Sequence, residues 1–294
     1  MIEIPAKKFK TFRLESWRDF DDFDPKSPQC VYRGQGKASW PLQTAYERKQ
    51  GVLNPMREQE MLQQFISQAG VYIKDFPPKD DFISWFALMQ HHGAGTRLLD
   101  VTRSKYIALF FALTGMIDSG CEEDGAVWVF KTLASNTTFF NAIMTTRERP
   151  CIDTRNDSLT QPLAEYKTLG ARFGNEFVRS DWCGEIRKGI EDEFVLQHRE
   201  RMKPFLENGG VMRVVPAKSN NRMVAQAAEF LMPITLRKSF EDNLKSCTDC
   251  NPEVVKLIVP IDQVRVMLEK LQEMNINYQT LYPDINGLAL AMNM

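Results

Sequence analysis

A cluster of polar side chains that are able to do chemistry lies in one short stretch of the chain, residues 90–102. Its imidazole, guanidinium, carboxylate and hydroxyl groups are those that transfer protons, bind anions or stabilise a developing cation. The glycines Gly93 and Gly95 separate an apolar helical pattern from the strand-like run 96–102 that follows. We interpret this junction as the edge of a functional site whose polar members are Gln90, His91, His92, Thr96, Arg97, Asp100 and Thr102.

Arg33 is a further candidate, because it lies inside a strand pattern, residues 30–36, that contains two glycines. A guanidinium presents parallel donors to a phosphate or a carboxylate, and Gly34 and Gly36 would let a ligand approach the backbone. The alternative interpretation is a surface arginine on an edge strand.

Structural roles are the alternative for the other charged candidates. His91 and His92 follow an apolar helix and fit satisfied helix-end residues as well as acid–base groups. Arg97 and Asp100 stand three residues apart in a strand, so their side chains should project to opposite faces and contact different partners. The apolar context of Asp100 predicts a buried carboxylate paired with Arg33 or with a helix N-terminus.

The elements that position these residues follow from apolar periodicity. Helices are predicted over 58–73, 82–89, 107–113 and 261–274, and strands over 125–130 and 254–260. Residues 1–29 predict a strand and a short helix, 211–215 and 190–195 predict strand or helix edges, and 220–233 predict a turn followed by a strand. We therefore expect an α+β fold with a mixed or antiparallel split sheet flanked by helices, in one domain over 30–294 with an N-terminal extension, 1–29.

The composition indicates a cytoplasmic protein with no membrane partner. The 294 residues are 43% hydrophobic and 26% charged, with a net charge of −1 and no apolar run long enough to span a bilayer. Six scattered cysteines suggest reduced thiols. Cys247 and Cys250 form one CxxC motif without a second pair, so we predict no metal site there.

The motifs together resemble the FRG domain, which is named for an aromatic-Arg-Gly signature. Its early elements correspond to Tyr32-Arg33-Gly34-Gln35, Trp40-Pro41-Leu42, Gln90-His91-His92-Gly93, Thr96-Arg97-Leu98-Leu99-Asp100-Val101-Thr102 and Ala108-Leu109-Phe110-Phe111-Ala112. Its later elements correspond to Asn221-Arg222 with Gln226 and Phe230, and to Leu281-Tyr282-Pro283-Asp284-Ile285-Asn286-Gly287.

The order of these motifs is also similar to that of ADP-ribosyltransferases, which implies an ADP-ribosyltransferase-like fold and NAD as the substrate. The similarity implies catalytic roles for Arg33, for Thr102 or Ser104, and for Glu229 or Gln226. It implies NAD contacts from Tyr32, Arg33, Gly34, Gln35, His91, Thr96, Arg97, Asp100, Ser104 and Arg222.

The chemistry of NAD cleavage explains these residue types. Breaking the nicotinamide–ribose bond builds positive charge on the sugar, which a carboxylate stabilises while an arginine holds the phosphates. Glu229 is the better charge stabiliser, whereas Gln226 fits the FRG pattern, and the sequence leaves both open.

The FRG resemblance further implies a toxin or antiviral-defence effector that modifies a protein or a nucleic acid and is restrained by an antitoxin protein. The alternatives are a non-enzymatic FRG module that binds a nucleotide or a partner, and a nuclease built on Asp100, Glu191, Asp192 and Glu193. Arg199, Arg201 and Lys203 are candidates for a small basic patch.

Overall fold

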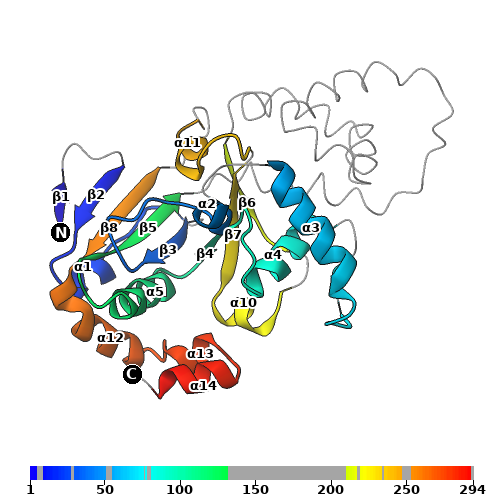
Figure 1. Cartoon of the computed structure of the whole chain (residues 1–294). Helices are drawn as coiled ribbons and strands as arrows, with labels where there is room; N and C mark the ends of the chain where they lie inside the picture. The colour runs from blue at the N-terminus through cyan, green and yellow to red at the C-terminus, as the bar shows by residue number, and fades with distance from the viewer. Residues whose placement is uncertain are drawn as a thin grey trace.

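The chain forms an α+β fold, as predicted, in which a mixed eight-stranded sheet is flanked by helices (Figure 1). The computed structural model describes residues 1–4, 9–27, 30–50, 55–75, 77, 81–131, 210–216, 219–233, 235–246 and 253–292. The predictions for 190–195, the CxxC cysteines, Glu191–Glu193 and the Arg199–Lys203 patch lie outside these ranges.

The sheet is antiparallel except where β2 pairs in parallel with β8. In order across the sheet, the strands are β1 (Ile2–Ile4), β2 (Lys10–Arg13), β8 (Val254–Val259), β5 (Gly125–Lys131), β3 (Cys30–Gln35), β4 (Leu99–Thr102), β7 (Ala228–Pro233) and β6 (Val211–Val214). The segment 1–29 thus contributes two strands to the same sheet as the rest, and a domain boundary after residue 29 stays a prediction.

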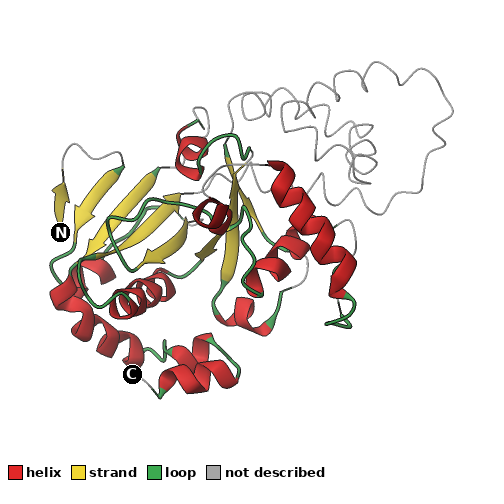
Figure 2. Cartoon of the chain, viewed as in Figure 1, coloured by secondary structure: helices red, strands yellow, loops and turns green. Residues whose placement is uncertain are grey.

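Helices lie on both faces of this sheet (Figure 2). They are α1 (Trp17–Asp21), α2 (Ala45–Gln50), α3 (Pro55–Ala69), α4 (Phe82–His91), α5 (Lys105–Asp118), α10 (Asn221–Ala225), α11 (Phe240–Lys245), α12 (Val264–Glu273), α13 (Tyr278–Leu281) and α14 (Ile285–Ala291), with a 3-10 turn, Ile261–Gln263, before α12. The long helices and strands predicted from periodicity are all present, and residues 211–215 are confirmed as a strand rather than a helix edge.

The pairing between β3 and β4 is short, and this splits the single sheet into two halves. β3 pairs with β5 along its whole length, whereas it pairs with β4 only at Tyr32–Thr102. Beyond that contact the two backbones diverge, so polar groups of Arg33 and Asp100 face a gap instead of a backbone ladder. This gap is where the site forms.

Three apolar clusters hold the sheet and its helices in place, and one of them spans both halves of the sheet. On one face α5 and α12 cover β3, β5 and β8 with a cluster that includes Phe110 and Met267. On the other face Trp128 and Phe240 belong to a second cluster that extends to β4 and β6. A third cluster, which includes Trp85, packs α3 and α4 against β6 and β7.

Gly34→Ala is expected to destabilise the fold strongly, because α5 lies directly on β3. A Cβ at Gly34 would overlap the carbonyl oxygen of Ala108 and come within 2.5 Å of the backbone nitrogen of Ala112. Overpacking of rigid backbone costs about 1–3 kcal/mol or more. Urea unfolding should show this loss, while Gly70→Ala, which meets nothing within 4 Å, should leave the midpoint unchanged. Equal midpoints for the two variants would contradict the packing.

Candidate functional site

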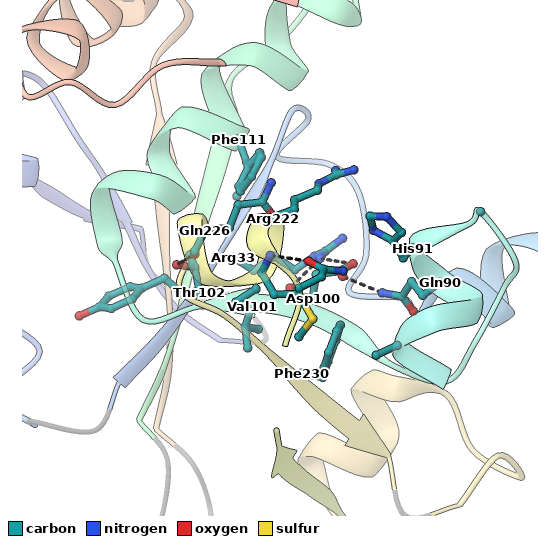
Figure 3. Close-up of a pocket in the computed structure, with 17 residues that line it drawn as sticks. Arg33, Gln90, His91, Asp100, Val101, Thr102, Phe111, Arg222, Gln226 and Phe230 are labelled. Carbon is teal, nitrogen blue, oxygen red and sulfur yellow. Dashed lines mark hydrogen bonds and ion pairs between the residues drawn. The ribbon is translucent and has the colours of Figure 1, made fainter. Parts of the chain in front are cut away.

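A pocket of about 410 Å³ opens where β3 and β4 separate (Figure 3). Its walls come from β3, α4, β4, α5, α10 and β7. The lining residues are Tyr32, Arg33, Gly34, Ala87, Gln90, His91, Gly93, Asp100, Val101, Thr102, Phe111, Asn220, Arg222, Met223, Gln226, Ala228 and Phe230.

Arg33 fills the gap between the diverging strands. Its Nη1 donates to the backbone carbonyl of Asp100 at 2.7 Å and lies 3.7 Å from that residue's Oδ2. Only 16% of the Arg33 side chain is exposed, and its Nε–H is buried with no hydrogen-bond partner in the structure. Burial lowers the pKa of the guanidinium and Asp100 opposes that shift, but an arginine stays charged in proteins. Buried donors are normally hydrogen-bonded, so the unpaired Nε–H makes Arg33 a candidate ligand contact.

Asp100 is exposed, which corrects the prediction of a buried carboxylate. Its side chain keeps 62% of its accessible surface, because the split leaves this end of β4 uncovered. Its Oδ1 accepts a 2.7 Å hydrogen bond from Nε2 of Gln90, and Oε1 of Gln90 in turn accepts from the hydroxyl of buried Thr96. The predicted contact between Asp100 and Arg33 is present.

Arg97 is buried, is not among the residues that line the pocket, and joins the segment before β4 to α3. Its Nε and Nη2 donate to Oε2 of Glu58 at 2.7 and 2.5 Å, and its backbone N–H donates to Oε1 at 2.8 Å. Arg97 and Asp100 thus contact different partners, as predicted. Neither Arg97 nor Thr96 lines the pocket, so the structure places these two predicted NAD contacts behind it.

Hydrogen bonds connect the end of β4 to α10 and to the start of α5. They involve Thr102, Ser104 and Gln226. The Thr102 hydroxyl donates to the carbonyl of Gln226 at 2.7 Å and accepts from the Ser104 N–H at 3.1 Å. Ser104 caps α5 and does not line the pocket. Nε2 of Gln226 donates to the carbonyl of Leu281 at 3.1 Å. Thr102 therefore orders the site, and Gln226 lines it.

Glu229 lies on the opposite face of β7 from the pocket. Ala228 and Phe230 line the pocket, and alternate residues of a strand point to opposite faces. The buried Glu229 carboxylate accepts two hydrogen bonds from Arg213, one of them at 2.6 Å, and lies 3.5 Å from Nε of Arg103. The structure therefore places Glu229 in a structural ion pair behind the sheet.

Arg222 supplies a second cation to the lining of the pocket (Figure 3). Its guanidinium carbon lies 4.2 Å from the centroid of the Tyr282 ring, a cation–π contact that fixes the side chain. Asp284 caps α14 by accepting from the N–H groups of Asn286 and Gly287, which holds the segment that carries Tyr282. The closing sequence motif thus supports the pocket indirectly.

His91 lies at the pocket rim, and its ring is 5.0 Å from that of His92, which does not line the pocket. Loss of hydration lowers the pKa of His91, and repulsion from His92 and Arg222 adds to this effect. Because the ordinary value is about 6.5, the His91 imidazole is neutral at pH 7 and is able to accept a proton.

Gln35 and the two strand glycines have structural contacts. Gln35 is buried and does not line the pocket. Its Oε1 accepts from Nε1 of Trp128 at 2.6 Å, and its Nε2 donates to the backbone carbonyl of Pro41 at 3.2 Å. Gly34 lines the pocket, but Gly34 and Gly36 both let α5 pack closely on β3, and Gly36 does not reach the pocket. Gly36 was expected to let a ligand approach the backbone, but in the structure it contacts Gly115 of α5 instead.

Sequence reasoning missed Phe111, Asn220 and Phe230, which also line the pocket. The two aromatic residues lie in apolar helix and strand patterns that indicate core. Asn220 caps α10 and is read from sequence as a turn residue. The position of Phe111 directly after Phe110 is a signal for it, since neighbouring helix residues point to different sides.

No group of three or more His, Cys, Asp or Glu side chains that could hold a metal ion occurs within the described ranges. The carboxylates Glu191–Glu193 of the nuclease alternative are outside those ranges. In the part of the chain with described structure, no helix combines the length and apolarity that crossing a membrane requires.

Fold and site together define an α+β protein with an arginine-lined pocket at a split in its sheet. The family model of the FRG domain matches residues 28–120, which confirms the FRG resemblance over the segment that carries Arg33, Gln90, Asp100 and Thr102. No curated protein and no solved structure matches the chain.

Proposed function

We propose that the chain is an NAD-dependent ADP-ribosyltransferase-like enzyme, which cleaves the nicotinamide–ribose bond and transfers ADP-ribose to a protein or nucleic acid. The observation that carries the proposal is the buried, unpaired Nε–H of Arg33 at the pocket in the sheet split. A phosphate oxygen is the acceptor that such a charge-assisted donor binds best.

The composition of the pocket supports a nucleotide diphosphate. Arg33 and Arg222 give two positive groups from different elements, and the half-buried Phe111 supplies aromatic surface for a base or a nicotinamide ring. A volume of about 410 Å³ lies in the range of small-molecule sites. In this arrangement Arg33 and Thr102 retain their proposed roles, and Gln226 takes the third-motif position instead of Glu229.

The pocket residues have different roles in the proposed reaction. The arginines hold the diphosphate rigidly, which fixes the ribose and lowers the entropic part of the barrier. Thr102 orders β4 against α10, and Gln226 faces the bound nucleotide. The acceptor approaches from the open side of the pocket. The FRG resemblance alone extends this proposal to a cytoplasmic toxin or antiviral-defence effector with an antitoxin partner, and growth arrest on expression that Arg33→Ala abolishes would support the extension.

Incubation of the purified chain with adenylate-labelled NAD and cell lysate tests the proposal. We expect nicotinamide release and label on a macromolecule, both lost in Arg33→Ala. If the chain binds a nucleotide but neither releases nicotinamide nor transfers label, the proposed enzymatic activity is overturned. That result would favour a non-enzymatic nucleotide-binding module. The placement of Glu229 behind the sheet is the observation that favours this second candidate.

A further inference from the structure

We infer that Asp100 is the carboxylate that stabilises the ribosyl cation, and that Gln90 positions it. The inference rests on the proposed function and deepens it, since Asp100 enters the motif comparison only as an NAD contact and Gln90 has no role there. Among the described residues that line the pocket, Asp100 is the one that carries a carboxylate.

Both carboxylate oxygens of Asp100 are oriented before any ligand binds. Oδ1 accepts from Nε2 of Gln90 at 2.7 Å, and Oδ2 lies 3.7 Å from Nη1 of Arg33. The backbone of the same residue is held as well, because its carbonyl accepts from Arg33 at 2.7 Å. A carboxylate fixed in this way needs little reorganisation when positive charge develops beside it.

Gln90 owes its orientation to Thr96. The Thr96 hydroxyl is fully buried and donates to Oε1 of Gln90, which leaves the amide Nε2–H to face Asp100. An amide assigned the other way round would place an acceptor against the carboxylate. The chain of contacts Thr96–Gln90–Asp100 therefore links the buried segment before β4 to the pocket.

The positive charge of Arg33 and the negative charge of Asp100 match two neighbouring parts of NAD, the diphosphate and the nicotinamide ribose. Arg33 offers its free Nε–H to a phosphate, and Asp100 lies directly beside it on the adjoining strand. In NAD the nicotinamide ribose is attached to the diphosphate, so an anchored diphosphate brings that ribose next to the carboxylate. A negative group there attracts the cationic pyridinium and interacts most strongly with the ribosyl cation.

The proposed reaction needs two reactants, NAD and the acceptor. The bond from C1′ of the ribose to the nicotinamide nitrogen breaks, and its electron pair neutralises the pyridinium, so neutral nicotinamide leaves. Positive charge spreads over C1′ and the ring oxygen, opposite the Asp100 carboxylate. A lone pair of the acceptor then bonds to C1′, and the acceptor loses its proton to solvent; with water as acceptor the products are ADP-ribose and a proton.

Steady-state nicotinamide release by the purified full chain tests the assignment. Asp100→Asn should lower kcat about a hundredfold while KM changes little, because the lost interaction forms in the transition state. Gln90→Leu should lower kcat about tenfold with KM preserved, and Gln90→Glu should lower it further by placing a carboxylate against Oδ1. A purely structural Gln90 would change KM and melting temperature together.

The matched control is Asp118→Asn, a carboxylate-to-amide change at the exposed end of α5, which should leave kcat and KM unchanged. Since Asp100 is exposed, the melting temperature of Asp100→Asn should also stay close to that of the wild type. An active wild type with undiminished kcat in Asp100→Asn would overturn this inference and leave the proposed function standing. A wild type that releases no nicotinamide would overturn both.

Discussion

Arg33→Lys is expected to weaken ADP-ribose binding nearly as much as Arg33→Ala, by about tenfold to a hundredfold. The guanidinium has two donors with different roles: Nη1 donates to the carbonyl of Asp100, and the buried Nε–H has no partner in the structure. Lysine carries one compact ammonium group and cannot supply both donors in a fixed plane. Calorimetric titration with ADP-ribose measures the difference.

Arg57→Lys provides the control for this substitution. Arg57 is half exposed on α3 and pairs with Glu60, so its replacement should leave the dissociation constant unchanged. Full affinity in Arg33→Lys would show that a single positive charge is enough, and the fork-like contact with phosphate would then be wrong.

Glu229→Gln is expected to reduce the free energy of unfolding by about 3 kcal/mol, while the folded protein keeps its turnover. The carboxylate is buried and faces Arg213, whose guanidinium would lose its charged partner and remain enclosed. Glu60→Gln is the matched control, because that pair is exposed and should contribute about 0–1 kcal/mol. Urea unfolding gives the stability, and nicotinamide release per folded molecule gives the turnover.

The opposite pattern would favour Glu229, one of the two alternatives that the motif order leaves open. If Glu229→Gln keeps its stability and loses turnover with ADP-ribose binding intact, Glu229 acts in the chemistry and the role assigned to Asp100 fails.

Local patterns predicted the helices and strands well because most of them bury one clear apolar face. Residues 125–130 are predicted as a strand, and β5 extends it to Lys131 and pairs on both sides. Residues 82–89 are predicted as a helix that α4 extends to His91. The capping contacts that end these elements are also local, as with Ser104 at the start of α5.

The site could be predicted less completely from sequence, because it depends on how the strands pair. The exposure of Asp100 follows from the single contact between β3 and β4 at Tyr32–Thr102, which no strand pattern encodes. The same holds for Glu229: alternation places it opposite Ala228 and Phe230, but only the packing of α4 and α10 decides which face holds the pocket. Arg33 was identifiable because an arginine inside a strand pattern needs a partner.

A structure of the chain with ADP-ribose bound tests the central claim most directly. We expect the diphosphate in the gap between β3 and β4, with a phosphate oxygen accepting from Nε of Arg33 and a ribose next to the Asp100 carboxylate. A nucleotide bound elsewhere, or an Arg33 Nε–H that stays unpaired in the complex, would contradict it.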